Sequence, residues 1–186
     1  MTSAQRPFRF GVQTGATGDL KEWTDVARRV EANGYSTLTM PDHFDGQLAP
    51  VPALQCAADV TSTLRLGALV YDNDYKHPVV LAKELATMDV LSEGRVEIGL
   101  GAGWMATDYA QSGIPYDPPG VRVSRMIEGL AESPFAELDP IVQRRVMLAI
   151  DVVVGVEGAR QDGGFIAIIG NHPFVLRLAV PTDEVV

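Results

Sequence analysis

The chain has 186 residues, of which 46% are hydrophobic and 21% charged, and its net charge at pH 7 is −9. This composition is typical of a soluble globular protein of one domain or slightly more. The negative charge argues against nucleic acid or an anionic membrane surface as the main partner. The single cysteine, Cys56, excludes an intrachain disulfide and favours a reducing, cytoplasmic location.

Neither a membrane span nor a signal peptide is expected. The longest apolar runs are much shorter than a membrane-spanning helix requires, and residues 1–7 have no apolar core of the kind a signal peptide carries.

The first part of the chain predicts a strand, a helix and a second strand. Alternating apolar residues favour a strand over 8–14. Asp19 is expected to cap the helix that follows, with Glu22 as its capping-box partner, and Asn33-Gly34 is expected to end it. The second strand is expected over 35–40.

The same pattern continues to about residue 101. A helix is expected over about 51–60, a strand over 64–70, a helix that begins at Pro78, and a strand from Arg95. Strands therefore begin roughly every 30 residues with one helix in each gap, which is the period of a βαβ unit. Such repetition predicts an α/β fold with a parallel sheet and helices outside it.

A β/α barrel of the TIM type is favoured over a doubly wound sheet, because the glycines near residue 100 do not form a dinucleotide-binding fingerprint. A complete barrel of this type needs on the order of 250 residues. We therefore expect an incomplete barrel of about four N-terminal β/α units over 1–133. A divergent C-terminal segment is expected over 134–186. Within that segment a helix is expected over 139–158, in which the valine run 152–154 fits a strand equally well. Two short strands are expected over 165–169 and 174–180.

In either α/β fold a ligand site is expected at the carboxyl ends of the strands. Glycine and polar residues gather at those ends, and the turn Gly101-Ala102-Gly103 is interpreted equally well as a packing turn or as a ligand turn. His43 follows the second strand and is interpreted either as a local backbone partner or as a proton donor oriented by Asp42 or Asp45. Asp72-Asn-Asp74 lacks the other features of a calcium loop, so a solvated loop and no metal site are expected there.

Several motifs in order resemble a known family. Residues 6 to about 130 are similar to the N-terminal half of luciferase-like flavin or deazaflavin (coenzyme F420) oxidoreductases. The motifs that carry the resemblance are Phe10-Gly-Val-Gln-Thr14, Ala32-Asn-Gly-Tyr-Ser36, Met40-Pro-Asp-His-Phe44, His77-Pro78, the segment 82–95 and Gly99-Leu-Gly-Ala-Gly-Trp104.

The resemblance implies a TIM-barrel fold with coenzyme F420, or alternatively FMN, across the carboxyl ends of the strands. By position, Asp42 and His43 correspond to the family's acidic and histidine pair beside the cofactor ring. Ala68 and Leu69 fall where the family often has a non-prolyl cis peptide behind the ring, and Gly101, Ala102 and Gly103 correspond to the turn that contacts the cofactor. Trp104 stands where some relatives carry an acidic glutamate, and it is expected to form a wall of the substrate pocket.

Three functions remain open for the chain. The first is an F420- or FMN-dependent oxidoreductase or monooxygenase that acts on a small organic molecule and is completed by self-association into a homo-oligomer. The second is a cofactor-binding remnant with little turnover. The third is a non-enzymatic interaction module with an exposed apolar face.

Overall fold

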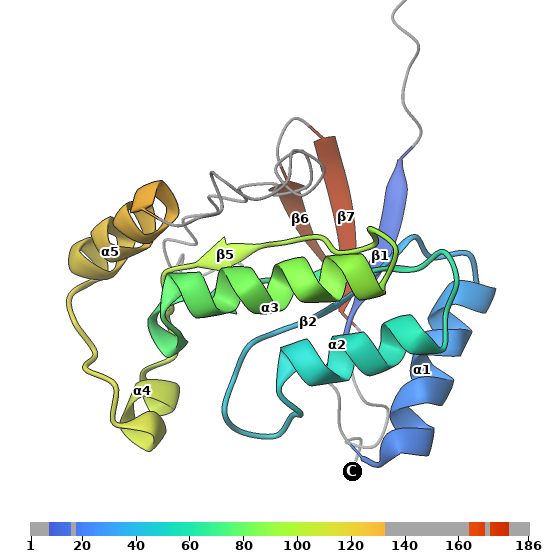
Figure 1. Cartoon of the computed structure of the whole chain (residues 1–186), viewed down its shortest axis with the longest axis horizontal. Helices are drawn as coiled ribbons and strands as arrows, with labels where there is room; N and C mark the ends of the chain where they lie inside the picture. Colours follow the sequence, from blue (N-terminus) through green and yellow to red (C-terminus); the bar gives the residue numbers. More distant parts are fainter. Residues whose placement is uncertain (1–7, 16–17, 133–163, 170–171, 179–186) are drawn as a thin grey trace, which may run out of the picture.

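The computed structural model describes residues 8–15, 18–132, 164–169 and 172–178. Strands and helices alternate through most of this region, as Figure 1 shows. The elements are β1 (Arg9–Gln13), α1 (Leu20–Ala32), β2 (Thr37–Met40), α2 (Pro50–Asp59), β3 (Arg65–Ala68), β4 (Tyr71–Asp72), the 3-10 helix η1 (Asn73–Tyr75), α3 (Pro78–Leu91), β5 (Leu100–Gly101), α4 (Ala106–Ser112), α5 (Pro119–Glu132), β6 (Gly164–Ile169) and β7 (His172–Leu178).

The main sheet has the strand order β3-β2-β1-β7-β6. β1 pairs in parallel with β2 and β7, and β2 pairs in parallel with β3. β6 pairs with β7 in the antiparallel sense. β4 and β5 form a separate parallel pair, and a parallel bridge between Leu66 and Val96 lies beside it. The predicted parallel βαβ arrangement is therefore confirmed for the first strands. The two late strands occur close to the predicted bounds, whereas 139–158 lies outside the described residues.

Local signals place the helix starts where the sequence predicts them. Asp19 caps α1, because its carboxylate accepts a hydrogen bond of 2.9 Å from the amide of Glu22. Pro78 occupies the first turn of α3, and the ring of His77 accepts a hydrogen bond from the amide of Val79. These caps satisfy amides that have no partner within the helix.

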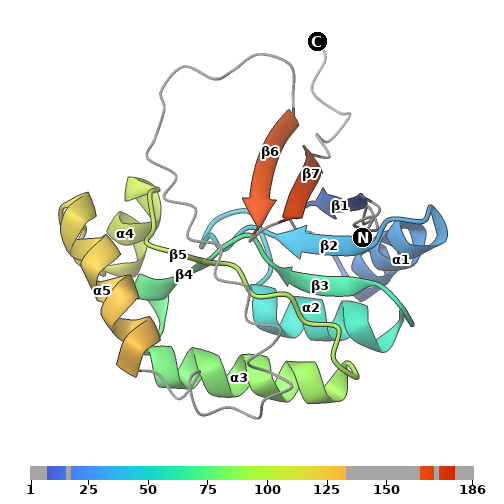
Figure 2. The same cartoon turned by 90° about the horizontal axis from the view of Figure 1, so that it is seen from above.

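The helices α1, α2 and α3 lie along one side of the strands, while α4 and α5 lie together at one end of the molecule (Figure 2). The core fills the space between the strands and these helices. Its fully buried members include Ala27, Leu38, Met40, Leu54, Ala57, Leu64, Leu66 and Leu85. No helix among the described residues is long and apolar enough to cross a membrane.

A polar cluster lies at the opposite end of the strands from the candidate site. Arg9 of β1 and Arg65 of β3 both pair with the carboxylate of Glu97, and the hydroxyl of Thr37 donates to it at 3.4 Å. The cluster joins three strands and the segment before β5. It therefore fixes their relative positions beneath the site.

Candidate site at the carboxyl ends of the strands

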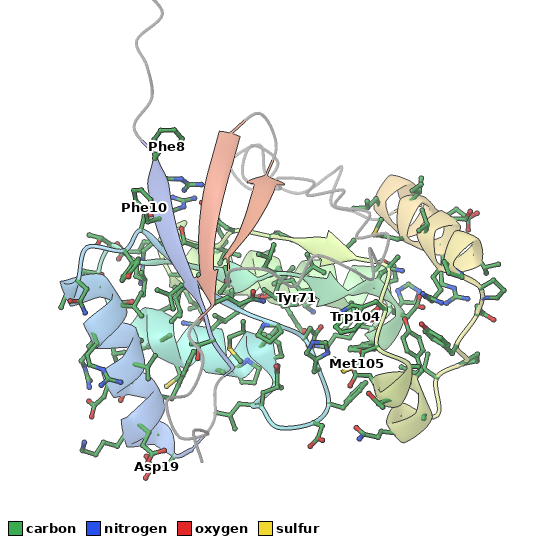
Figure 3. All side chains as sticks on the ribbon, turned by 180° about the vertical axis from the view of Figure 1, so that it is seen from behind. Phe8, Phe10, Asp19, Tyr71, Trp104 and Met105 are labelled. Atoms are coloured by element: carbon green, nitrogen blue, oxygen red, sulfur yellow. The ribbon has the colours of Figure 1, made fainter. Side chains whose placement is uncertain are left out.

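Three loops at the carboxyl ends of the strands hold the candidate site. His43 follows β2, Asp72 ends β4, and Trp104 follows β5. Figure 3 shows Trp104 and Met105 at the end of the molecule that carries α4, far from Phe8 and Phe10 near the start of β1. The site therefore lies where a parallel α/β sheet is expected to bind its ligand.

His43 pairs with Asp108, an aspartate of α4. The distance from Nδ1 of His43 to Oδ2 of Asp108 is 2.7 Å, and 22% of the histidine side chain is exposed against 1% of the aspartate. The prediction that Asp42 or Asp45 orients the imidazole was wrong. A residue 65 positions along the chain does so, because α4 returns over the end of β2.

Asp108 is held by three donors. Besides His43, the hydroxyl of Tyr75 donates to it at 2.8 Å and the amide of Phe44 at 3.3 Å. Burial opposes ionisation of this carboxyl, but the hydrogen bonds from His43, Tyr75 and Phe44 outweigh it and hold its pKa below the usual value. Asp108 is therefore a carboxylate at neutral pH.

Asp42 faces a different partner. Its carboxylate accepts a hydrogen bond of 3.1 Å from the amide of Asp72 and so ties the loop after β2 to β4. Burial raises the pKa of the Asp42 carboxyl, while the amide of Asp72 and the positive charge of Lys76 act in the opposite direction. The role of Asp42 beside a cofactor remains a prediction.

The expectation of a solvated loop at 72–74 was wrong. Asp72 and Asn73 are buried, and only 1% of the Asp74 side chain is exposed. Arg125 of α5 pairs with Asp74 at 2.8 Å, and the hydroxyl of Tyr109 donates to the same carboxylate at 3.0 Å. α4 and α5 therefore cover this loop. The described residues hold no cluster of side chains that would bind a metal ion.

Burial also raises the pKa of Asp72, to about 6. The neighbouring carboxylates of Asp74 and Asp42 add to this effect, whereas hydrogen bonds from the amide of Asp74 and from the hydroxyl of Tyr109 oppose it. Asp72 consequently changes its charge within the mildly acidic range.

The glycines of the turn after β5 are explained by packing. A Cβ on Gly101 would lie 2.3 Å from Cγ2 of Val70. Gly103 has a φ of +72°, and a Cβ there would lie 1.9 Å from the hydroxyl of Tyr109 and 2.4 Å from a carboxylate oxygen of Asp72. Ala102 is partly buried against the core. Contact of this turn with a cofactor remains a prediction.

The cis peptide lies one bond later than the resemblance implies. It joins Leu69 to Val70 rather than Ala68 to Leu69. The amide of Leu69 donates to the carbonyl of Met40 at 2.8 Å. The carbonyl of Leu69 accepts from the side chain of Gln13 at 2.9 Å, so both backbone groups of this residue are held.

Trp104 is a largely exposed residue of the predicted site. Its side chain is 63% exposed, and its ring lies edge-on to His43 with 6.0 Å between the ring centroids. The structure thus brings His43 and Trp104 together.

Four contributing residues were missed at the level of the sequence: Tyr75, Asp108, Tyr116 and Arg122. The spacing of Asp108 four positions after Trp104 gives no signal by itself. Arg122 belongs to α5, and its guanidinium reaches the carbonyls of the turn after β5. The roles of these four residues depend on contacts between segments that are distant in the chain.

These features define an α/β protein with a candidate ligand site at the carboxyl ends of parallel strands. The sequence profile described as luciferase-like monooxygenase matches residues 5–131. The chain therefore belongs to the luciferase-like monooxygenase family.

Three known proteins illustrate the relationship. The F420-dependent glucose-6-phosphate dehydrogenase of Amycolatopsis mediterranei is 29% identical over 118 residues, which covers 59% of this chain and 35% of that enzyme. The coenzyme F420-dependent tetrahydromethanopterin reductase of Methanopyrus kandleri has a similar fold, with a TM-score of 0.58 at 23% identity over 66% of this chain and 39% of that one. The oxygenating component of 3,6-diketocamphane monooxygenase of Pseudomonas putida, solved with FMN, gives a TM-score of 0.56 at 16% identity over 65% and 38%. This chain spans less than half of the length of these three proteins.

Proposed function

We propose that the chain binds coenzyme F420, with FMN as the alternative, at the carboxyl ends of β2, β4 and β5, and that it takes part in hydride transfer to or from a small organic substrate. The observation that carries this proposal is the pairing of His43 with the buried carboxylate of Asp108 beside the exposed ring of Trp104. Family membership and the F420-dependent dehydrogenase among the relatives support it.

The residues at the site fit a planar ring ligand. The imidazole of His43 is partly exposed, and the indole of Trp104 offers an aromatic surface on which a ring can stack. The backbone of the turn 101–103 and the segment around Leu69 would lie against the same ligand. Asp42 would act through the amide of Asp72, which it already binds.

Coenzyme F420, when bound, accepts or supplies the hydride. Because the Asp108 carboxylate only accepts hydrogen bonds, Nδ1 of His43 must donate to it. With Nδ1 as the donor, the neutral form of the imidazole has its free lone pair on Nε2. We infer that Nε2 takes the hydroxyl proton when an alcohol is oxidised to a carbonyl compound, and returns it in the reverse reaction.

We also propose that residues 1–133 form the first four β/α units of a TIM-type barrel and that residues 134–186 are a divergent C-terminal segment. The parallel pairing from β7 through β1 and β2 to β3 supports the barrel-like part. The antiparallel pairing of β6 with β7 supports the divergence, because the strands of such a barrel are all parallel.

We propose that the chain self-associates into a homo-oligomer, because α3 exposes apolar side chains. Four apolar side chains on this helix are between 44% and 73% exposed: Val79, Val80, Val90 and Leu91. Exposed apolar side chains at both ends of one helix favour burial against another surface. Measurement of the mass in solution tests this point, and a monomer at all concentrations would contradict it.

Titration of the purified chain with coenzyme F420 and with FMN tests the cofactor. We expect one of them to bind, and we expect absorbance of bound F420 to fall when suitable alcohols are added. His43→Ala is expected to reduce that rate by about 100-fold or more while affinity changes little, since general acid–base catalysis contributes this much.

His77→Asn is the matched control, because it removes a histidine that caps α3 and keeps an acceptor for the amide of Val79. This variant is expected to retain the rate. A folded chain that binds neither cofactor would contradict the proposed function. A His43→Ala variant that loses affinity and keeps its rate would contradict the proton-transfer role.

A further inference from the structure

The backbone of the turn after β5 is held by side chains rather than by strand pairing. Three successive carbonyls accept hydrogen bonds from Tyr116, which precedes α5, and from Arg122 in the first turns of α5. Arg122 donates from Nε to Ala102 at 3.0 Å and from Nη2 to Gly103 at 3.2 Å, and the hydroxyl of Tyr116 donates to Trp104 at 2.9 Å. These bonds begin directly after the last residue of β5.

Arg122 is itself fixed from several directions. Only 4% of the residue is exposed, and its guanidinium lies 4.4 Å from the ring centroid of Tyr116 and 5.7 Å from that of Tyr109. Its third nitrogen, Nη1, donates to the carbonyl of Asp117. Within the described residues it forms no salt bridge.

A buried cation without a carboxylate partner is costly, and an apolar side chain of similar size would fill the same space at lower cost. The fork of parallel donors on a guanidinium, however, can hold two adjacent carbonyls at once. Fixing the turn is therefore the property that distinguishes arginine from an apolar residue at this position.

The backbone of residues 102–104 sets the position of the Trp104 side chain. The indole is 63% exposed, so packing alone gives it little support, yet it lies edge-on to His43 at 6.0 Å and 84°. Its direction depends on the peptide groups on either side of it, and their carbonyls are those held by Arg122 and Tyr116.

We infer that Arg122 and Tyr116 are positioning residues, forming a latch that holds the turn 102–104 and sets Trp104 against His43. This inference deepens the proposed function, because Trp104 is the wall of the proposed pocket. The latch itself consists only of contacts within the chain, so it can be tested without a cofactor.

The chain contains two tryptophans, which makes the test direct. Incorporation of 5-fluorotryptophan gives one ¹⁹F resonance for Trp104 and one for Trp23, and Trp104→Phe assigns them. Trp23 is 2% exposed and donates to the carbonyl of Ala53 at 2.7 Å, so its resonance reports whether the core remains folded.

Arg122→Lys keeps the charge but removes the fork, and Tyr116→Phe removes one hydroxyl and keeps the ring. In both variants we expect the Trp104 resonance to move toward that of free 5-fluorotryptophan, while the Trp23 resonance stays in place. Loss of one such hydrogen bond is expected to lower the ratio of the held to the released conformation of the turn by about fivefold.

Arg125→Lys is the matched control on the same helix, because Arg125 bonds to Asp74 and Asp117 and not to the turn. It is expected to leave the Trp104 resonance unmoved. Loss of the Trp23 resonance would reveal that Arg122→Lys fails to fold. In that case Tyr116→Phe alone tests the inference.

A Trp104 resonance that stays at its original position in the folded latch variants would overturn the inference. An equal shift in the Arg125→Lys control would also overturn it. Failure of the chain to bind F420 or FMN would refute the proposed function and leave this result unaffected.

Discussion

Replacement of Asp72 by asparagine is expected to stabilise the protein at neutral pH and to have little effect in acid. Burial raises the pKa of the Asp72 carboxyl to about 6, from 3.8 for an ordinary aspartate. At a pH between these two pKa values, the Asp72 carboxyl holds a proton in the folded protein, whereas in the unfolded chain it has already released it. The free energy of unfolding therefore falls as the pH rises from about 4 to about 6, and it is level above that range.

The magnitude follows from the difference between the two pKa values. A pKa difference of about two units lowers the free energy of unfolding by about 3 kcal/mol at neutral pH. Asparagine removes the charge and keeps an oxygen that can accept from the amide of Asp74, a bond of 2.9 Å. We expect Asp72→Asn to raise the free energy of unfolding by about 1–3 kcal/mol at pH 8, after allowance for the altered contact with Tyr109.

Urea unfolding followed by circular dichroism, between about pH 4 and pH 8, measures this difference directly. Asp45→Asn, a change in the exposed loop after β2, controls for the loss of one surface charge. A loss of stability in Asp72→Asn at pH 8 would refute the reasoning, and so would a gain of equal size at pH 4 and pH 8.

Two further predictions concern stability, and urea unfolding checks both. Gly103→Ala is expected to cost about 2–4 kcal/mol, because a Cβ there would overlap two buried side-chain oxygens. Gly113→Ala has nearly the same φ, +73°, and open space around it, so it is expected to cost only about 1 kcal/mol; equal losses would contradict the packing role of Gly103. Glu31 accepts hydrogen bonds from the amides of 62–64, and although burial opposes ionisation, these bonds lower its pKa. Glu31→Gln is therefore expected to cost about 1–3 kcal/mol at neutral pH, a difference that shrinks as the pH falls below about 4; a constant difference down to pH 3 would contradict it.

The elements that the sequence predicted well are those specified by neighbouring residues. Asp19 and Pro78 mark helix starts because a cap or a proline acts on amides within one turn. The alternation in 8–14 predicts β1 because successive side chains of a strand point to opposite faces. The placement of His43 and Trp104 at one end of the sheet follows from the repeat itself, since the carboxyl ends of parallel strands lie together.

The sequence by itself determined the βαβ order, the helix caps, the end of the sheet that carries the site and the motifs that resemble the family, because each depends on residues close together in the chain. Only the tertiary structure decided that Asp108, rather than Asp42 or Asp45, binds His43, and that Asp72 is buried. It also decided that Arg122 holds the turn before Trp104. The physical reason is the same in each case. The partner comes from a distant segment, and its distance, burial and charge exist only once α4 and α5 have packed over the ends of the strands.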